Sequence, residues 1–254
     1  MAFDLSSIKP TRRDTPERIL IHGPHKVGKS TFGAMAPSSI FIPTEDGQDN
    51  LDAQAFPLCK SWDDITAAIT TLYIEDHEFK TVVLDSADWS ESLAQKKVAE
   101  NHNVDGIEGI GYGKGYTYVA DLFREVLDGL NALRLKKGMR VVLLCHSEIR
   151  RFDDPQADSY DRYQIKLHKL VGKLVQEWSD VIGFAQMDVL TKVEEKKGFK
   201  AERTRAIDSG RRVLRLEGGA AFDAGNRYSL PAELPLEWPA FEEALNQAKE
   251  QTNG

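Results

Sequence analysis

The sequence has few cysteines and no apolar run long enough to cross a membrane. Among 254 residues only Cys59 and Cys145 are cysteines, and neither belongs to a Cys-x-x-Cys or His/Cys cluster. This scarcity argues against a disulfide framework and gives no sign of a zinc site. The first residues also lack the basic and apolar segments of a signal peptide. We therefore expect a cytoplasmic protein without a membrane partner.

The chain also lacks an excess of basic residues. Its 40 acidic and 33 basic residues give a formal net charge of −7, which does not suit a protein coated in basic surface for nucleic acid. A local basic groove stays compatible with this balance. The length and the 41% of hydrophobic residues suffice for one sizeable core. We expect a main domain over residues 18–235, an N-terminal arm over 1–17 and a C-terminal helix and tail over 236–254.

One glycine-rich segment carries the strongest functional signal. Residues 23–30 read Gly-Pro-His-Lys-Val-Gly-Lys-Ser and fit the phosphate-binding pattern G-x-x-x-x-G-K-[ST]. An apolar run over residues 18–22 predicts a buried strand before the loop, and residues 30–36 predict a short helix after it, closed by Pro37. The sequence therefore predicts a nucleoside triphosphate site, against the alternative of a glycine turn before an ordinary helix.

Each residue type in this loop has a physical reason. Gly23 and Gly28 permit backbone conformations and a close approach that a Cβ forbids, so that successive N–H groups can face the phosphates. Lys29 is placed to neutralise the β and γ phosphates, Ser30 to bind Mg²⁺ through its hydroxyl, and Thr31 to donate to the α phosphate. The expected ATP-binding residues are Gly23, Pro24, His25, Lys26, Val27, Gly28, Lys29, Ser30 and Thr31.

Strand and helix patterns alternate along the rest of the chain. The expected strands are 39–43, 81–86, 140–146 and 181–185, and the expected helices are 61–76, 86–100, 116–136, 166–178 and 239–251. Two polar strands within 188–207 and a third over 212–216 are expected to pair antiparallel. The pattern predicts an α/β fold with a mainly parallel central sheet flanked by helices and with C-terminal antiparallel strands.

Three of these strands are followed by side chains that can serve a nucleotide. Because ligands of parallel sheets bind at the carboxyl ends of the strands, Glu45, Asp85 and His146 are expected beside the glycine loop. Asp85 follows an apolar run and has the placement of a second metal-site carboxylate, which holds Mg²⁺ through its water shell. The alternative is that Asp85 caps the next helix. Glu45 can polarise a water against the γ phosphate.

Residues 40–52, which read IFIPTEDGQDNLD, resemble the RecA-like ATPases. In that family the strand after the P-loop helix ends in a water-activating glutamate. The strand that ends at Asp85 is similar to the one that carries the family's Mg²⁺ carboxylate, and the strand that ends at 145–148 is similar to the one with its γ-phosphate sensor. The resemblance implies a RecA-like P-loop NTPase core with His146 as the sensor, while Glu148 stays an alternative.

A second resemblance lies at residues 225–231, which read GNRYSLP. It is to the K-x-R element of hexameric RecA-like helicases and phage nucleotide-binding proteins, which reaches the γ phosphate of a neighbouring subunit. Arg227 matches the arginine, whereas Gly225 stands where that element has lysine. Over about residues 18–235 the chain resembles phage-encoded RecA-like ATP-binding proteins, some of which anneal single strands. The implied catalytic residues are Glu45, Lys29, His146 and Arg227.

Two segments correspond in this resemblance to the loops with which RecA-like recombinases contact single-stranded DNA. Residues 101–118 are rich in glycine and tyrosine, and residues 149–164 contain arginines, tyrosines and four aspartates. Cations neutralise phosphates and tyrosines stack on bases, although the aspartates can instead pair with the arginines. The expected DNA-binding residues are Lys114, Tyr116, Arg150, Arg151, Arg162 and Tyr163.

The resulting hypothesis is an ATPase that uses ATP and Mg²⁺ and binds single-stranded DNA in phage recombination or replication, by annealing or strand exchange. The resemblance implies a homo-oligomer, either a ring or a helical filament, in the bacterial host cytoplasm, with a phage single-strand-binding protein as a further partner. Three alternatives stay open. They are a helicase-like protein, a regulatory P-loop protein without annealing activity, and a nucleotide kinase, for which the sequence has no clear arginine-rich lid.

Overall fold

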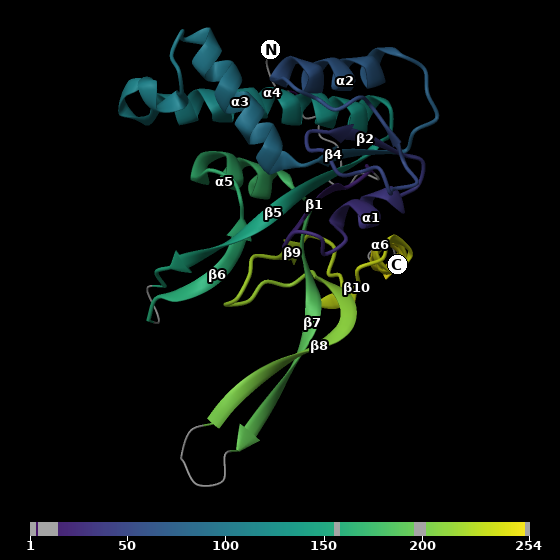
Figure 1. Cartoon of the computed structure of the whole chain (residues 1–254). Helices are drawn as coiled ribbons and strands as arrows, with labels where there is room; N and C mark the ends of the chain where they lie inside the picture. Colours follow the sequence, from purple (N-terminus) through teal and green to yellow (C-terminus); the bar gives the residue numbers. More distant parts are fainter. Residues whose placement is uncertain (1–3, 5–14, 155–157, 196–201, 252–254) are drawn as a thin grey trace.

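A mostly parallel sheet with helices on both faces forms the centre of the protein (Figure 1). The computed structural model describes residues 4, 15–154, 158–195 and 202–251. The strands are β1 (Arg18–Gly23), β2 (Ser39–Pro43), β3 (Gln54–Ala55), β4 (Thr81–Asp85), β5 (Arg140–Phe152), β6 (Tyr160–Ile165), β7 (Val181–Glu195), β8 (Glu202–Arg215), β9 (Gly225–Asn226) and β10 (Glu233–Pro235). The helices are α1 (Lys29–Ala34), α2 (Trp62–Ile74), α3 (Ala87–Asn101), α4 (Lys114–Lys136), α5 (Lys169–Trp178) and α6 (Trp238–Gln251), with the 3₁₀ turns η2 (Ile107–Gly109) and η3 (Gly111–Gly113). None of the helices within these ranges is both long and apolar enough to cross a membrane.

The strand order confirms the predicted α/β architecture. The sheet runs β10-β8-β7-β1-β5-β4-β2-β3, and every neighbouring pair from β7 to β3 is parallel. The pairs β7–β8, β8–β10, β7–β9 and β5–β6 are antiparallel. Because β5 lies between β1 and β4 and is parallel to both, the ends of β1 and β4 share one edge with His146 of β5, with Gly23 opposite His146 and Asp85 opposite Leu144.

Each face of the sheet has its own apolar layer, since successive side chains of a strand point to opposite faces. Leu20 faces the layer that α2, α3, α4 and α5 cover, whereas Ile19 and Ile21 face the layer that α1 and α6 cover. In the second layer the rings of Phe32 on α1 and Trp238 on α6 lie 5.1 Å apart. The C-terminal helix is thus packed directly on the helix that follows the glycine loop.

A buried ion cluster joins the start of β1 to the end of the chain. Glu17 is fully buried, and its carboxylate pairs with Arg140 of β5 at 2.6 Å and with Lys249 of α6 at 2.5 Å. Burial raises the pKa of Glu17, but the two cations outweigh this effect and lower it. The predicted arm over 1–17 otherwise lies mostly outside the described residues.

The prediction of a loop over residues 149–164 is wrong. β5 continues to Phe152 and pairs with β6 in a hairpin, from Ser147 opposite Ile165 to Phe152 opposite Tyr160. Residues 155–157 lie outside the described residues. Most of this hairpin extends away from the core with partly or fully exposed side chains, so its sequence shows no alternation of apolar and polar residues.

The predicted loop over residues 101–118 is also shorter than expected, because α4 begins at Lys114 and includes Tyr116. Gly113, just before the helix, has a left-handed φ of 70°, and Gly115 packs so closely on η2 that a Cβ would come 2.5 Å from the Ile107 side chain. The glycines that suggested a loop therefore form a tight entry into a helix.

Four short strands were expected between residues 181 and 216, but the structure has two long strands there, β7 and β8. β7 and β8 form a single hairpin that projects beyond the sheet (Figure 1). The predicted break near residue 188 coincides with a register shift between Met187 and Val189, a β-bulge that bends a strand without ending it. Residues 196–201 between the strands lie outside the described residues.

Replacing Trp238 with alanine is expected to lower the free energy of unfolding by about 3 to 5 kcal/mol, because a side chain that is 1% exposed leaves a cavity against α1. Urea denaturation followed by circular dichroism measures the loss. The matched control is Trp89→Ala, since Trp89 on α3 is 49% exposed, and its loss is expected to stay below about 1 kcal/mol. Equal losses in the two variants would contradict the assignment of α6 to the core.

Candidate functional site

The glycine loop lies at the edge of the sheet where β1, β2 and β4 end and where β5 continues into its hairpin with β6 (Figure 1). Gly23 closes β1 and is held tightly, because a Cβ there would come 2.3 Å from the carbonyl oxygen of Ala185 on β7. Gly28 has a φ of 109°, which a residue with a Cβ rarely adopts. Both glycines of the pattern are therefore required by the backbone itself.

Lys29 is a buried cation inside this loop. Its Nζ donates to the carbonyl oxygens of Gly23 at 3.1 Å and Pro24 at 2.9 Å, and burial lowers its pKa. Loop carbonyls are neutral partners for a buried ammonium. Phosphate oxygens in the loop would supply the negative charge that such a group favours.

Among the other residues predicted to bind ATP, three side chains are exposed and one is buried in the core. His25, Lys26 and Thr31 are exposed. Val27 is 4% exposed and belongs to the apolar layer between the sheet and α6, so it can serve a ligand only through its backbone. The loop thus combines an anchored apolar residue with polar side chains that face solvent.

Ser30 and Asp85, the two residues predicted to hold a metal, contact each other. The Ser30 hydroxyl on α1 lies near enough to the Asp85 carboxylate at the end of β4 to lower its pKa by hydrogen bonding, and Nε2 of Gln48 donates to Oδ2 of Asp85 at 2.9 Å. Burial raises the pKa of Asp85, while these hydrogen bonds oppose the rise. Hydroxyl and carboxylate oxygens are the ligand types that Mg²⁺ takes in proteins. Gln48 was missed by sequence reasoning, although it lies in the polar segment that follows β2.

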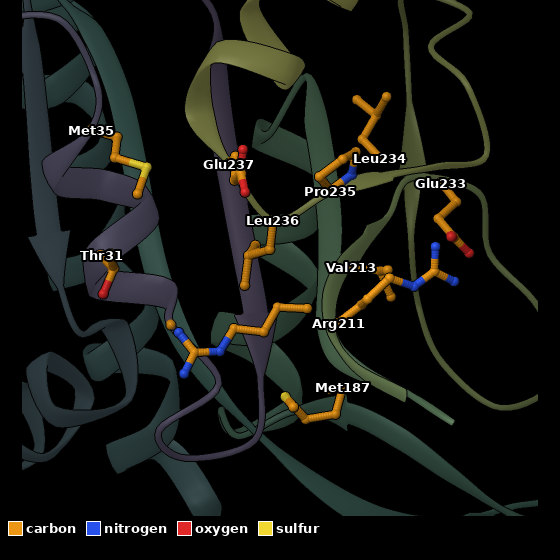
Figure 2. Close-up of a pocket in the computed structure, with 13 residues that line it drawn as sticks. Thr31, Met35, Met187, Arg211, Val213, Glu233, Leu234, Pro235, Leu236 and Glu237 are labelled. Atoms are coloured by element: carbon orange, nitrogen blue, oxygen red, sulfur yellow. The ribbon is translucent and has the colours of Figure 1, made fainter. Parts of the chain in front are cut away.

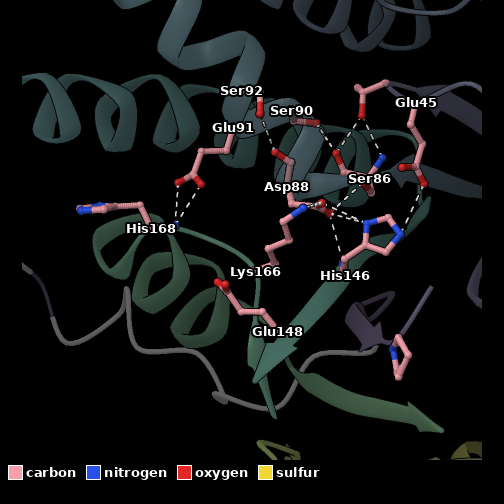
Figure 3. A network of polar contacts seen from close by, with 12 residues as sticks. Glu45, Ser86, Asp88, Ser90, Glu91, Ser92, His146, Glu148, Lys166 and His168 are labelled. Carbon is pink, nitrogen blue, oxygen red and sulfur yellow. Dashed lines mark hydrogen bonds and ion pairs between the residues drawn. The ribbon is translucent and has the colours of Figure 1, made fainter. Parts of the chain in front are cut away.

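His146, at the centre of the same edge, is fixed from several sides (Figure 3). Its Nδ1 lies 3.0 Å from Oδ2 of Asp88, and its backbone N–H donates to Oδ1 of Asp88 at 3.1 Å. Its Nε2 lies 3.9 Å from Oε1 of Glu45, and its ring stacks on that of His25 with centroids 4.0 Å apart. The predicted sensor and the predicted water-activating glutamate are therefore neighbours.

Glu45 and Glu148 have different surroundings. Burial raises the pKa of Glu45, and the neighbouring His146 opposes the rise. Glu148, the alternative sensor, lies two residues further along β5 and forms an ion pair with Arg150. Of these two glutamates, the structure places Glu45 against His146.

A cavity of about 590 Å³ adjoins the loop on the α1 side (Figure 2). Thr31 and Met35 line one wall, and Met187, residues 210–213 and residues 233–237 line the other. The guanidinium of Arg212 lies so close to the loop that a Cβ on Gly28 would be 3.2 Å from it. The volume is in the range of small-molecule sites. No local sequence signal marks this cavity, because distant segments build it.

Arg227 lies away from the loop of its own chain. Its guanidinium pairs with Asp180 at 3.0 Å and donates to the carbonyl oxygen of Glu177 at 3.0 Å. Asp180 also pairs with Arg18 at 2.7 Å, and these residues lie where β1 and β7 begin, at the edge opposite the loop. A role for Arg227 at the site of a neighbouring subunit stays a prediction.

Three predicted DNA-binding side chains of the β5–β6 hairpin make contacts within the chain. Arg150 forms an ion pair with Glu148, and Arg162 forms one with Asp223 at 2.7 Å. Tyr163 is half-buried, with its ring beside that of a core phenylalanine. DNA would have to displace these contacts. The sequence suggested such a competition, because acidic residues that can pair with the arginines are abundant in this segment.

The other three predicted DNA-binding residues lie at the surface or in a ring stack. Arg151 and Lys114 are exposed. Tyr116 on α4 stacks on His168, with ring centroids 4.0 Å apart. Because His168 follows β6 and caps α5, this stack joins the start of α4 to the start of α5, just beyond the second segment that the sequence assigns to DNA.

Comparison with protein families matches residues 15–228 to the family described as AAA domain. The matched range contains the glycine loop, Glu45, Asp85 and His146. A search of curated proteins gives no match.

Glu91 is a buried acid next to this site on α3. Both of its carboxylate oxygens accept the backbone N–H of His168 at 3.0 Å (Figure 3), and the residue is 7% exposed. Burial raises its pKa from the ordinary 4.5 to about 7. The folded protein therefore holds the proton of Glu91 more tightly than the unfolded chain does.

From this difference, Glu91→Gln is expected to exceed the wild type in unfolding free energy by about 1 to 3 kcal/mol at pH 8. The folded pKa is the higher one, so the wild type loses stability as the pH rises from 4.5 through 7, whereas the amide never ionises. The advantage should shrink toward pH 4.5, as denaturant titrations at both pH values can measure. Glu100→Gln, on an exposed part of the same helix, is the control and should show no such trend; an advantage for Glu91→Gln independent of pH would refute the assignment.

Proposed function

The chain belongs to the AAA domain family of P-loop ATPases, and on this premise we propose that it is a Mg²⁺-dependent ATPase with a RecA-like core. The observation that carries the proposal is the contact between Ser30 and Asp85 beside the buried Lys29. A cation for phosphates and a pair of oxygen ligands for a metal are thus assembled at one edge of the sheet.

The residues present fit a Mg²⁺ ion. Ser30 would hold it through its hydroxyl, and Asp85 through its carboxylate or the ion's water shell. When bound, Mg²⁺ supplies positive charge that offsets the charge of the phosphate oxygens. Lys29 and the N–H groups of the loop contribute further positive potential to the same phosphates.

Glu45 is the proposed general base. Its carboxylate is partly buried at the loop edge, and burial raises its pKa, which makes it a better acceptor for the proton of a water that attacks the γ phosphate. His146, whose Nε2 lies 3.9 Å from Oε1 of Glu45, is the proposed sensor of the γ phosphate. A base for water at the end of β2 favours hydrolysis over transfer of the phosphoryl group to a second substrate, as in a kinase.

The cavity beside Thr31 is the proposed site of the nucleoside. Thr31 lies on the side of the α phosphate, and the nucleoside would extend from there between α1 and the segment 233–237 (Figure 2). Met35 and Leu236 offer apolar contacts to a base, and Arg212 offers a cation. This placement gives the cavity beside the loop a role in ATP binding.

We also propose that the protein binds single-stranded DNA, on the strength of one further observation. β5 carries His146 at the nucleotide edge and continues directly into the β5–β6 hairpin, and the stack of Tyr116 on His168 joins the start of α4 to the residue that caps α5, three residues after β6. The resemblance to phage proteins supports a homo-oligomer, ring or filament, that acts in annealing or strand exchange with a phage single-strand-binding protein. In such an oligomer Arg227 would serve a neighbouring site.

The ATPase proposal is tested with Glu45→Gln. The variant should release phosphate from ATP at least about 100-fold more slowly, because the amide cannot accept the proton, while its ATP affinity should stay within about threefold. Lys29→Ala should lose both phosphate release and affinity for ATP. Glu125→Gln, on the exposed face of α4, is the control and should keep wild-type turnover and affinity. Unaltered turnover in Glu45→Gln would remove Glu45 from the mechanism.

A salt titration tests the DNA proposal. The logarithm of the binding constant for single-stranded DNA should fall linearly with the logarithm of salt concentration, and Lys114→Gln with Arg151→Gln should reduce that slope by about 1 to 2. Fluorescence anisotropy with a labelled oligonucleotide measures both, with and without ATP. Lys136→Gln, at the other end of α4, is the control. No binding at low salt would exclude the DNA function and leave the ATPase proposal standing.

A further inference from the structure

Behind His146 lies an acid that the proposed hydrolysis does not use directly. Asp88 is in the first turn of α3, three residues after Asp85, and its side chain is 4% exposed. An acid in the first turn of a helix often interacts with the N–H groups of its own helix. Asp88 instead makes its main hydrogen bonds to another element, β5.

The contacts of Asp88 fix both the backbone and the side chain of His146. Oδ1 accepts the backbone N–H of His146 at 3.1 Å, and Oδ2 lies 3.0 Å from Nδ1 of its ring. The Ser86 hydroxyl donates to Oδ1 at 2.9 Å, and Nζ of Lys166 lies 3.9 Å from Oδ2. These partners hold the carboxylate in place, so it presents a fixed acceptor to the imidazole.

The charge state of Asp88 decides the direction of its bond to the ring. Burial raises the pKa of Asp88, but hydrogen bonds from His146 and Ser86 outweigh burial and lower it to about 2. An ionised carboxylate can only accept hydrogen bonds. The proton of the Nδ1···Oδ2 contact therefore belongs to His146.

We infer that Asp88 is a positioning residue for ATP hydrolysis, because it holds the His146 ring with Nδ1–H toward itself and with Nε2, an acceptor in this form, toward Glu45 and the phosphate edge, where it can accept a hydrogen bond from the attacking water. The stack on His25 at 4.0 Å supports the same ring plane from the P-loop side. A partner on one ring nitrogen fixes the proton and orientation of the other. The kinetic part of this inference rests on the proposed function, whereas the ring orientation is a property of the protein alone.

Asp88→Asn separates positioning from shape. Its side-chain oxygen can still accept the backbone N–H of His146, but its amide group presents a donor to Nδ1 and therefore opposes the Nδ1–H form. The expected result is a kcat lowered about 10- to 100-fold with ATP affinity within about twofold. The matched control is Asp63→Asn, an exposed acid in the first turn of α2 that pairs with Lys97, which should keep the wild-type kcat.

Nitrogen-15 NMR of the histidine rings supplies a readout that does not depend on turnover. In the wild type without nucleotide, His146 should carry a proton on Nδ1, and in Asp88→Asn that proton should move to Nε2. The resonances are assigned from a His146→Gln spectrum. If Asp88→Asn does not fold, the wild-type spectrum alone still tests whether Nδ1 of His146 carries the proton.

Three outcomes are distinguishable. A lowered kcat together with the proton shift would support the inference. A wild-type ring with its proton on Nε2 alone, or an unchanged kcat in Asp88→Asn, would overturn it while the ATPase proposal stands. A wild type that binds ATP without hydrolysing it would refute the proposed function, and the NMR result would then judge the ring orientation by itself.

Discussion

The close parallel packing of β1 between β5 and β7 is the constraint on which the rest of the site depends. A Cβ at Gly23 would come 2.3 Å from a backbone oxygen of β7, so β1 can end in this position only with a glycine. The loop that starts there brings Lys29 back onto the carbonyl of the same glycine. Since β5 separates β1 from β4, the loop, Asp85 and His146 end at one edge, where their charges can act on a common ligand.

β5 connects the chemistry of this edge to the surface of the protein. Its first half is buried and parallel to its neighbours, whereas its second half forms an exposed antiparallel hairpin with β6. His146 lies at the change between the two halves, held by Asp88 through both backbone and ring. If the γ phosphate contacts His146, it contacts a residue of β5, which is also one strand of the hairpin. A shift of His146 on nucleotide binding would therefore reach the hairpin along a continuous strand, with no flexible loop between them.

Much of the fold and part of the site could be predicted from local patterns. The run 39–43 and the loop over 23–30 have strong signals, because buried parallel strands are continuously apolar and the loop pattern is specific. The β5–β6 hairpin escaped prediction, since strands that leave the core carry no apolar alternation, whereas the antiparallel pairing within 188–207 was predicted and is part of the β7–β8 hairpin. Asp88 and Arg212 escaped as well: their partners, His146 and the loop, come from other parts of the chain.

The sequence by itself determined the phosphate loop, the succession of strands and helices along the chain, and the carboxylate at the end of β4, because each depends on neighbouring residues and backbone conformation. The tertiary structure decided which polar groups meet. It set Ser30 against Asp85 and His146 between Asp88 and Glu45, and it moved Arg227 to the opposite edge of the sheet. Such contacts follow from the order of the strands within the sheet and from their register. Long-range packing sets both, and no local pattern encodes them.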